Sequence, residues 1–298
     1  MYFFSVVIPT YNRALFISKT IDSVLDQTFK DFEIVVVNDG STDNTLEVLE
    51  EYNGLEGFSV FTHTNSERGA SRNQGIKLSK GRYVVFLDSD DLLKDTHLET
   101  LHKHILANNY PNFIANKYLF KLEDREWKNK DLSSLHSGYH SYKTFLRGNM
   151  LACMYACKRE NDQLAYFQED RSLTIMEDWI FLLENLREDT IYISDDHTSF
   201  LVDHEQRSMR KDHTRVIMSR LKAMEWVKEN LSLPMGDFRT LSFWSHYFCS
   251  VHYYIDGNTK MAFKYYWKLW NGPILSKVLI VHFIRLMIGQ RLISKLRS

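Results

Sequence analysis

Short apolar runs alternate with helical patterns through the first hundred residues of the chain. Continuous apolar runs at Phe4–Ile8, Phe32–Val37 and Tyr83–Leu87 are typical of strands that are covered on both faces. Residues 15–27 carry apolar side chains at helical spacing, and Ser59–His63 predicts a further short strand. Strand, helix and strand in this order form a right-handed parallel unit. The pattern predicts an α/β fold with a mostly parallel central sheet flanked by helices.

Three carboxylates follow one of these predicted strands. The segment Asp88–Asp91 comes directly after Tyr83–Leu87, and open α/β sheets bind ligands at the C-terminal edge of their strands. Two acids separated by one small residue can approach a single hard divalent cation, and a phosphorylated ligand is the natural further partner. The alternative is a polar turn whose last acid caps a helix that begins near Leu92.

Polar loops also end the other two strands. Pro9–Arg13 ends the first strand abruptly, and Asn38–Asp43 follows the second. Gly40 predicts a tight turn, after which a polar residue caps a helix through residues 46–49. The acid that a calcium loop needs after its glycine is missing, and no dinucleotide fingerprint or Walker sequence occurs.

Four of these motifs stand in a fixed order with helix-length spacers between them: Val6–Asn12, Val37–Asp43, Arg68–Asn73 and Leu87–Asp91. Together they resemble the family 2 inverting glycosyltransferases with the GT-A fold, of the non-processive, cell-envelope polysaccharide type. The resemblance is strong to about residue 100 and looser to about residue 215. It implies a GT-A nucleotide-diphospho-sugar transferase domain over residues 1–215, followed by a helical C-terminal region over residues 216–298.

The resemblance also implies a donor site. Thr10, Tyr11 and Asp39 match positions that hold the nucleotide base and ribose. Asp88 and Asp90 match the motif that binds the ribose and a metal, Mn²⁺ or Mg²⁺, on the diphosphate. The further substrate-binding positions are Asn12, Arg13, Arg68, Ser89, Glu177 and Arg72, the last of which matches a contact to the nucleoside.

A pair of acids opens a later predicted helix. Glu177 and Asp178 precede an apolar stretch of helical character, and an acid in a first turn is stabilised by the helix dipole. A plain helix-start acid is the alternative. In the resembled family such a pair occurs here and the aspartate is the general base, which implies Asp178 as the catalytic residue. Met176 stands where those enzymes often carry glycine.

Two predicted strands, Thr190–Ile193 and Thr198–Val202, lead into the loop Asp203–Met209. A histidine followed shortly by serine resembles the loop that closes over the diphosphate in many relatives, and in some of them the histidine is a metal ligand. His204 is therefore either a metal ligand or a histidine on a surface loop. Arg207, with Arg210, could neutralise phosphate charge through forked hydrogen bonds.

The middle of the chain carries fewer signals. In the resembled family it continues the sheet and shapes the acceptor side, so Gly148–Leu151 and Cys153–Tyr155 could be a loop and a strand that face the donor sugar. The cysteines Cys153, Cys157 and Cys249 fit a reducing compartment and ordinary packing, because no export signal precedes the first strand. We therefore expect a cytoplasmic protein.

The C-terminal segment differs in charge from the rest. From residue 257 to 298 there are eight basic residues and no acid, which leaves 29 basic and 38 acidic residues before it. Trp267 and Trp270 and many aliphatic residues are interleaved with these charges, and no apolar span is long enough to cross a bilayer. The segment from about residue 258 suits a helix lying on an anionic membrane surface, and a core-packing helix is the alternative. Nucleic-acid binding is disfavoured, because no base-reading module accompanies the charge.

These features predict a metal-dependent glycosyltransferase of the hexosyltransferase class, peripheral on the inner face of the cell membrane. It would move a sugar from a nucleotide-diphosphate donor, a UDP-sugar, to a hydroxyl of a glycan or polyisoprenyl-linked glycan acceptor. One alternative is a sugar nucleotidyltransferase, although its glycine-rich, lysine-bearing opening is absent after Ile8. The other is a non-catalytic, membrane-associated nucleotide-binding scaffold. A processive synthase is disfavoured, because no Gln-x-x-Arg-Trp motif occurs.

Overall fold

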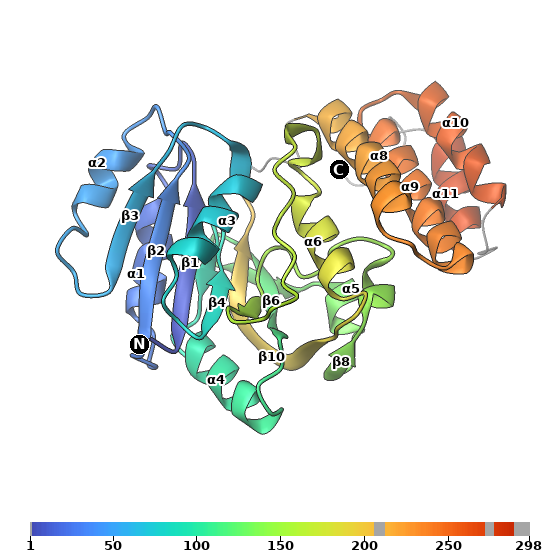
Figure 1. Cartoon of the computed structure of the whole chain (residues 1–298). Helices are drawn as coiled ribbons and strands as arrows, with labels where there is room; N and C mark the ends of the chain where they lie inside the picture. The colour runs from blue at the N-terminus through green and yellow to red at the C-terminus, as the bar shows by residue number, and fades with distance from the viewer. Residues whose placement is uncertain (1, 206–211, 272–276, 289–298) are drawn as a thin grey trace. The chain divides into compact units, whose positions relative to one another are not determined.

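The computed structural model describes residues 2–205, 212–271 and 277–288. The chain forms two compact units. Residues 1–142 and 149–204 make up the first unit, and residues 143–148 and 205–298 make up the second. The first unit carries the sheet and the second is helical (Figure 1).

A mixed sheet of ten strands forms the first unit, in the order β3-β2-β1-β4-β9-β6-β10-β5, with β7 beside β6 and β8 beside β10. Strand β1 pairs in parallel with β2 and β4, and β2 pairs in parallel with β3. The predicted α/β fold with a mainly parallel amino-terminal half is therefore confirmed. The strands are β1 (Phe4–Thr10), β2 (Phe32–Asn38), β3 (Phe58–Thr62), β4 (Tyr83–Phe86), β5 (Leu92–Leu93), β6 (Phe113–Leu122), β7 (Arg125–Lys128), β8 (Gly138–His140), β9 (Ala156–Lys158) and β10 (Ile191–Val202).

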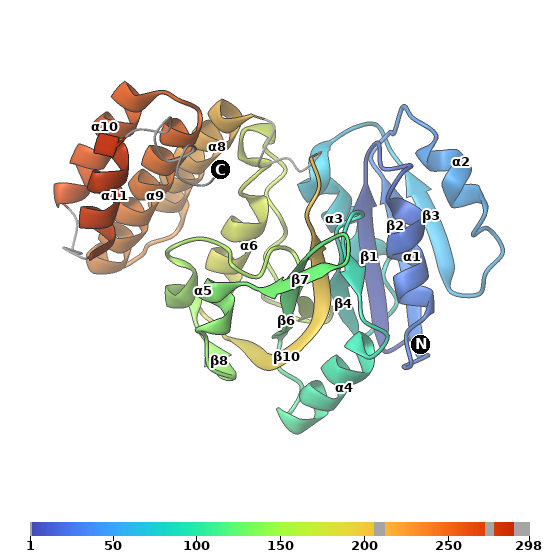
Figure 2. The same ribbon diagram turned by 180° about the vertical axis from the view of Figure 1, so that it is seen from behind.

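Helices cover both faces of the parallel strands, and α1 and α3 lie on opposite faces (Figures 1 and 2). Val6 and Ile8 of β1 belong to the same apolar core as Ile21 of α1. On the other face α3 approaches β1 so closely that a Cβ on Gly75 would lie 2.2 Å from a methyl carbon of Val7. The helices of this unit are α1 (Ile17–Leu25), α2 (Thr45–Glu50), α3 (Glu67–Leu78), α4 (His97–Ala107), α5 (Lys130–Ser133) and α6 (Glu177–Asn185), with a short 3₁₀ turn at η2 (Arg171–Leu173). A further 3₁₀ turn, η1 (Tyr142–Phe145), begins at the last residue of this unit's first segment and continues into the second unit.

The helix that the alternative interpretation of Asp88–Asp91 placed near Leu92 does not form. Leu92–Leu93 forms the short strand β5, which pairs with β10, and helix α4 begins only at His97. The carboxylate of Asp91 accepts a hydrogen bond from the backbone N–H of Val202 at 3.0 Å instead of capping a helix. The segment Asp88–Asp91 is a turn, in which the Asp91 N–H donates to the Asp88 carbonyl oxygen at 3.0 Å, but its last acid caps no helix.

Two strand predictions also need correction. The segments expected as two strands after residue 190 form one strand, β10, whose pairing with β6 shifts register between Ile193 and Ser199. The strand expected at Cys153–Tyr155 lies instead at Ala156–Lys158, between β4 and β6. Both errors come from pairings with distant segments, which local periodicity does not reveal.

The second unit consists of α8 (His213–Asn230), α9 (Met235–Ile255), α10 (Thr259–Lys268), the turn η3 (Leu269–Asn271) and α11 (Lys277–Ile288). Helices α9, α10 and α11 share a core that includes Phe243, Tyr266, Leu279 and Leu286. None of the helices in the described residues has the length and apolar character that crossing a bilayer requires.

Helix α11 has two different faces. Leu279, His282 and Leu286 are buried, so the core-packing alternative describes that face. The other face is exposed and apolar, with exposed fractions between 41% and 65%. Its members, which we call the α11 outer face, are Ile280, Val281, Ile284, Met287 and Ile288.

Candidate active site

The loops after β1, β2 and β4 meet at one edge of the sheet, because parallel strands end on the same side. Asn12 connects the first two loops, since its side-chain carbonyl accepts a hydrogen bond from the Thr42 N–H at 2.7 Å. Its backbone φ of 52° lies in the left-handed region, which asparagine tolerates better than most residues. The backbone N–H of Arg13 adds a second link, to the Thr45 hydroxyl at 2.9 Å.

The acids after β4 form a cluster at this edge. Carboxylate oxygens of Asp88, Asp90 and Asp91 all lie within 4.8 Å of one another. Oxygen donors at this spacing fit a hard divalent cation such as Mg²⁺ or Mn²⁺. Basic side chains neutralise part of the charge, because Arg13 Nε lies 3.4 Å from Asp90 Oδ2. The donor set therefore fits the metal that the sequence predicts.

His204 is next to this cluster. Its Nε2 lies 2.9 Å from Asp90 Oδ2, and its ring packs against Phe16 at a centroid distance of 4.5 Å. Only 11% of the side chain is exposed, so the surface-loop alternative does not describe this histidine. Its role as a metal ligand stays a prediction. Arg207 and Arg210 lie outside the described residues.

Arg72 connects the acidic cluster with the start of helix α6. Its guanidinium is 1% exposed and donates to Asp88 Oδ1 and to Glu177 Oε1, both at 2.7 Å. It also lies 5.3 Å above the ring of Phe167. Arg68 approaches Glu177 from a second direction, at 3.8 Å. In the described structure Arg72 thus holds two carboxylates, and its predicted contact with a nucleoside stays a prediction.

Glu177 is buried, and desolvation raises its pKa to about 7 although Arg68 and Arg72 favour the charged form. Its Oε2 has no hydrogen-bond partner among the described residues. This side chain therefore contacts α3 rather than solvent. Any contact with substrate, as the sequence predicts, would require it to become accessible.

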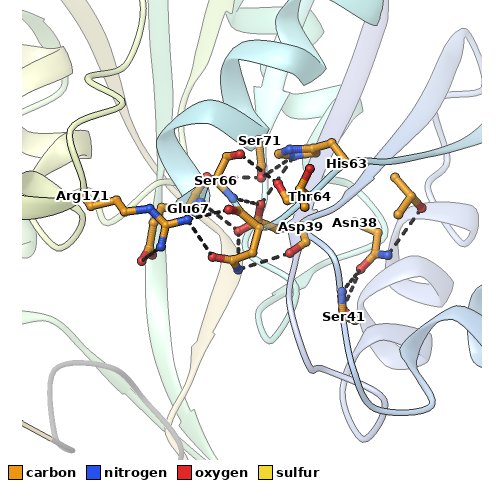
Figure 3. Close-up of polar contacts among 11 residues, drawn as sticks. Asn38, Asp39, Ser41, His63, Thr64, Ser66, Glu67, Ser71 and Arg171 are labelled. Carbon is orange, nitrogen blue, oxygen red and sulfur yellow. Dashed lines mark hydrogen bonds and ion pairs between the residues drawn. The ribbon is translucent and has the colours of Figure 1, made fainter.

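Asp39 follows strand β2, and its carboxylate lies against the start of helix α3 (Figure 3). Its carboxylate accepts hydrogen bonds from the backbone N–H groups of Ser66 at 2.7 Å and Glu67 at 3.0 Å, and from the Asn65 side chain at 3.0 Å. Desolvation raises the pKa of Asp39, whereas these backbone donors lower it. The side chain fixes the loop before α3 in addition to its predicted contact with the nucleoside.

The remaining predicted donor residues differ in exposure. The Tyr11 ring is 43% exposed at the end of β1, whereas Thr10 and Ser89 are buried. The Thr10 hydroxyl has no hydrogen-bond partner among the described residues. The exposed Tyr11 ring is a suitable surface for a heterocyclic base.

Asp178, the predicted base, is hydrogen-bonded through both carboxylate oxygens. Oδ1 accepts from the Trp179 backbone N–H and Oδ2 from the Asn149 side chain, each at 2.7 Å. Burial raises the pKa of Asp178, and the charge of Arg72 and the two hydrogen bonds oppose that shift. Sequence reasoning missed the link to Asn149. The only signal was the place of Asn149 in a loop expected to face the donor.

An acidic cluster at the end of a parallel strand and an acid pair at the start of helix α6 fit an α/β protein of the GT-A type. Comparison with known proteins agrees. The family model described as Glycosyl transferase family 2 matches residues 5–161. That range is more than half of the chain, and the chain therefore belongs to glycosyl transferase family 2.

Curated relatives support the same family. Poly(ribitol-phosphate) beta-N-acetylglucosaminyltransferase TarP of Staphylococcus aureus is 42% identical over 118 residues, which cover 38% of this chain and 36% of TarP. An uncharacterized glycosyltransferase of Rickettsia bellii is 37% identical over 56% of this chain and 23% of its own length. This chain thus spans about a quarter to a third of these two relatives.

Solved structures show the same fold. S. aureus TarS 1–349 in complex with UDP-GlcNAc has a TM-score of 0.66 at 22% identity, over 87% of this chain and 76% of that one. The mannosyltransferase PcManGT from Pyrobaculum calidifontis, in complex with GDP-Man and Mn²⁺, has a TM-score of 0.63 at 14% identity, over 98% of this chain and 82% of that one. The predicted GT-A fold and the predicted family are confirmed.

Proposed function

We propose that this protein is an inverting glycosyltransferase that moves a sugar from a UDP-sugar to a hydroxyl of a glycan or lipid-linked glycan. The observation that carries the proposal is the cluster of Asp88, Asp90 and Asp91 at the end of a parallel strand. Support for the donor comes from TarS 1–349, which has the same fold and whose structure holds UDP-GlcNAc. Support for the acceptor class comes from the relative TarP, a poly(ribitol-phosphate) beta-N-acetylglucosaminyltransferase.

In this proposal Asp88, Asp90 and His204 hold Mn²⁺ or Mg²⁺. When bound, such an ion stabilises the negative charge of the diphosphate leaving group. Arg13 adds positive charge at the same place, because its guanidinium already lies 3.4 Å from Asp90. Tyr11 contacts the base, as the exposure of its ring permits.

Asp178 performs the proton transfer. The acceptor oxygen forms a bond to the anomeric carbon from the face opposite the diphosphate, and its proton passes to the Asp178 carboxylate. The bond from the anomeric carbon to the diphosphate breaks, and the diphosphate leaves with the electron pair. General base assistance of this kind contributes about 10²- to 10⁴-fold to the rate.

The test is a panel of nucleotide sugars incubated with the protein and Mn²⁺ but without acceptor. We expect slow release of free sugar and UDP from one UDP-sugar, and loss of this release with EDTA. In a parallel incubation with UTP and a sugar phosphate, a sugar nucleotidyltransferase would release pyrophosphate. A non-catalytic scaffold would give neither product, and either of these results overturns the proposal.

We also propose that the protein binds the cytoplasmic membrane surface through the α11 outer face. The support is chemical: Lys277 and Arg285 are on the same helix, and the segment from residue 257 onward has no acid. Trp267 and Trp270, next to it in the second unit, are 58% and 54% exposed. Basic residues with exposed aromatic and aliphatic groups suit the headgroup region of an anionic leaflet. The part of this segment beyond residue 288 lies outside the described residues.

A further inference from the structure

We infer that Asn149 is a positioning residue that fixes the orientation and the charged state of the Asp178 carboxylate. This inference rests on the proposed function, in which Asp178 is the base. Asn149 follows the 3₁₀ turn η1 and precedes β9, and it is 29 positions away from Asp178 in the sequence. Both residues belong to the first unit.

Three hydrogen bonds define the Asn149 side chain. Its Nδ2 donates to Asp178 Oδ2 at 2.7 Å and to the carbonyl oxygen of Ala152 at 2.5 Å. Its Oδ1 accepts from the backbone N–H of Leu151 at 2.9 Å. Two acceptors face one end of the amide and one donor faces the other, so only this orientation satisfies all three contacts. The amide is therefore a fixed donor to Asp178.

A fixed donor suits a general base. Each carboxylate oxygen has two acceptor positions, and Asn149 and the Trp179 N–H occupy one on each oxygen of Asp178. One position on each oxygen remains for the acceptor hydroxyl. The amide of Asn149 cannot itself take up the proton, and its hydrogen bond favours the ionised carboxylate over the protonated acid.

Other groups around Asp178 either raise or lower its pKa. Arg72 of α3 favours the ionised form, whereas burial and the charge of Asp88 disfavour it. Burial raises the pKa values of Cys153 and Tyr155 well above their ordinary values, so both stay neutral at physiological pH. The titratable groups that interact with Asp178 are Arg72, Asp88, Cys153, Tyr155 and Glu177. Among side chains, Asn149 supplies the hydrogen bond that offsets burial.

Two substitutions test the inference. Asn149→Ala removes the donor, and Asn149→Asp keeps the shape but places a second carboxylate against Asp178. The pKa of Asp178 can be followed without substrate by carboxyl ¹³C NMR of aspartate-labelled protein, with the resonance assigned through Asp178→Asn. We expect the pKa to rise by about one unit in Asn149→Ala. A larger rise is expected in Asn149→Asp, because two adjacent carboxylates share a proton.

The kinetic readout is the acidic limb of the kcat profile, which should move to higher pH by the same amounts as the pKa. UDP affinity, measured by calorimetry, should stay within twofold, which also shows that the variants are folded. Asn161→Ala is the matched control, because Asn161 is likewise a loop asparagine whose side chain accepts a backbone N–H. It should leave the Asp178 pKa unchanged.

An Asp178 pKa that is unchanged in both Asn149 variants overturns the inference. Failure of the proposed function looks different. In that case Asp178→Asn retains turnover, or no donor is turned over, while the NMR shifts in the Asn149 variants still occur.

Discussion

At the scale of single residues, the acids of the site are held in place by specific partners. Asp178 has an amide and a backbone N–H, and Asp88 and Glu177 share the Arg72 guanidinium. For Asp178 the two hydrogen bonds favour the charged form that a general base needs, because they oppose the effect of desolvation.

The base role of Asp178 gives the first prediction. Asp178→Asn preserves the size of the side chain but cannot accept the acceptor's proton. Turnover should fall by at least about a hundredfold, the lower bound for general base assistance. The affinity for UDP should be nearly unchanged. Steady-state kinetics measures the turnover, and calorimetry measures the UDP affinity. Wild-type turnover in the variant would remove Asp178 from the base role.

Glu177 gives a prediction for stability. Its pKa is raised from the ordinary 4.5 to about 7, so the folded protein binds more protons than the unfolded chain between these values. The free energy of unfolding contributed by this group is present below about pH 4.5 and is lost as the pH rises to about 7. Urea titrations across this range should show that decline in the wild type and a smaller one in Glu177→Gln. Parallel profiles for the two proteins would contradict the assignment.

At the scale of elements, the amino-terminal half could be predicted from sequence. The strands β1, β2 and β4 are continuous apolar runs, and α1 has a clear apolar stripe, so local pattern determines them. The strand β5 has two residues and exists through its pairing with β10, more than a hundred positions later. No local signal could reveal that pairing.

In the candidate site, too, local motifs could be predicted from sequence and contacts between distant segments could not. Motifs in the loops after β1 and β4 identified Arg13, Asp88 and Asp90, which the structure brings together at one edge. The link between Arg72 and Glu177 spans 105 positions, and the link between Asn149 and Asp178 connects a loop with the first turn of helix α6. These contacts depend on how β9 and α6 pack in the first unit, which residue spacing does not determine.

Helix α11 gives the prediction at this scale. Replacing Ile280, Ile284 and Met287 with serine should weaken cosedimentation with vesicles that contain phosphatidylglycerol, while neutral phosphatidylcholine vesicles should bind weakly in all cases. These side chains are 49% to 65% exposed, so the fold should be preserved. The matched control is Leu106→Ser, at an exposed leucine of the first unit. Equal sedimentation of the triple variant and the wild type would contradict membrane binding through this face.

At the scale of the whole molecule, a formal net charge of −1 conceals an uneven distribution. All 38 acidic residues precede residue 257, and eight basic residues follow it. The acids that the proposed chemistry uses therefore belong to the first unit, and the basic segment belongs to the second. A donor site and a membrane-binding surface on separate units would allow the enzyme to act on an acceptor anchored in the membrane.

The central claim is that Asp88 and Asp90 bind a nucleotide diphosphate together with a divalent cation. Calorimetry of UDP binding, with and without Mn²⁺, tests it most directly, in the wild type, in Asp90→Asn and in the control Asp196→Asn, whose side chain is 52% exposed. We expect UDP binding that requires Mn²⁺ in the wild type and in the control, and a loss of at least tenfold in affinity in Asp90→Asn. UDP affinity that is independent of Mn²⁺, or that is the same in all three proteins, would contradict the claim.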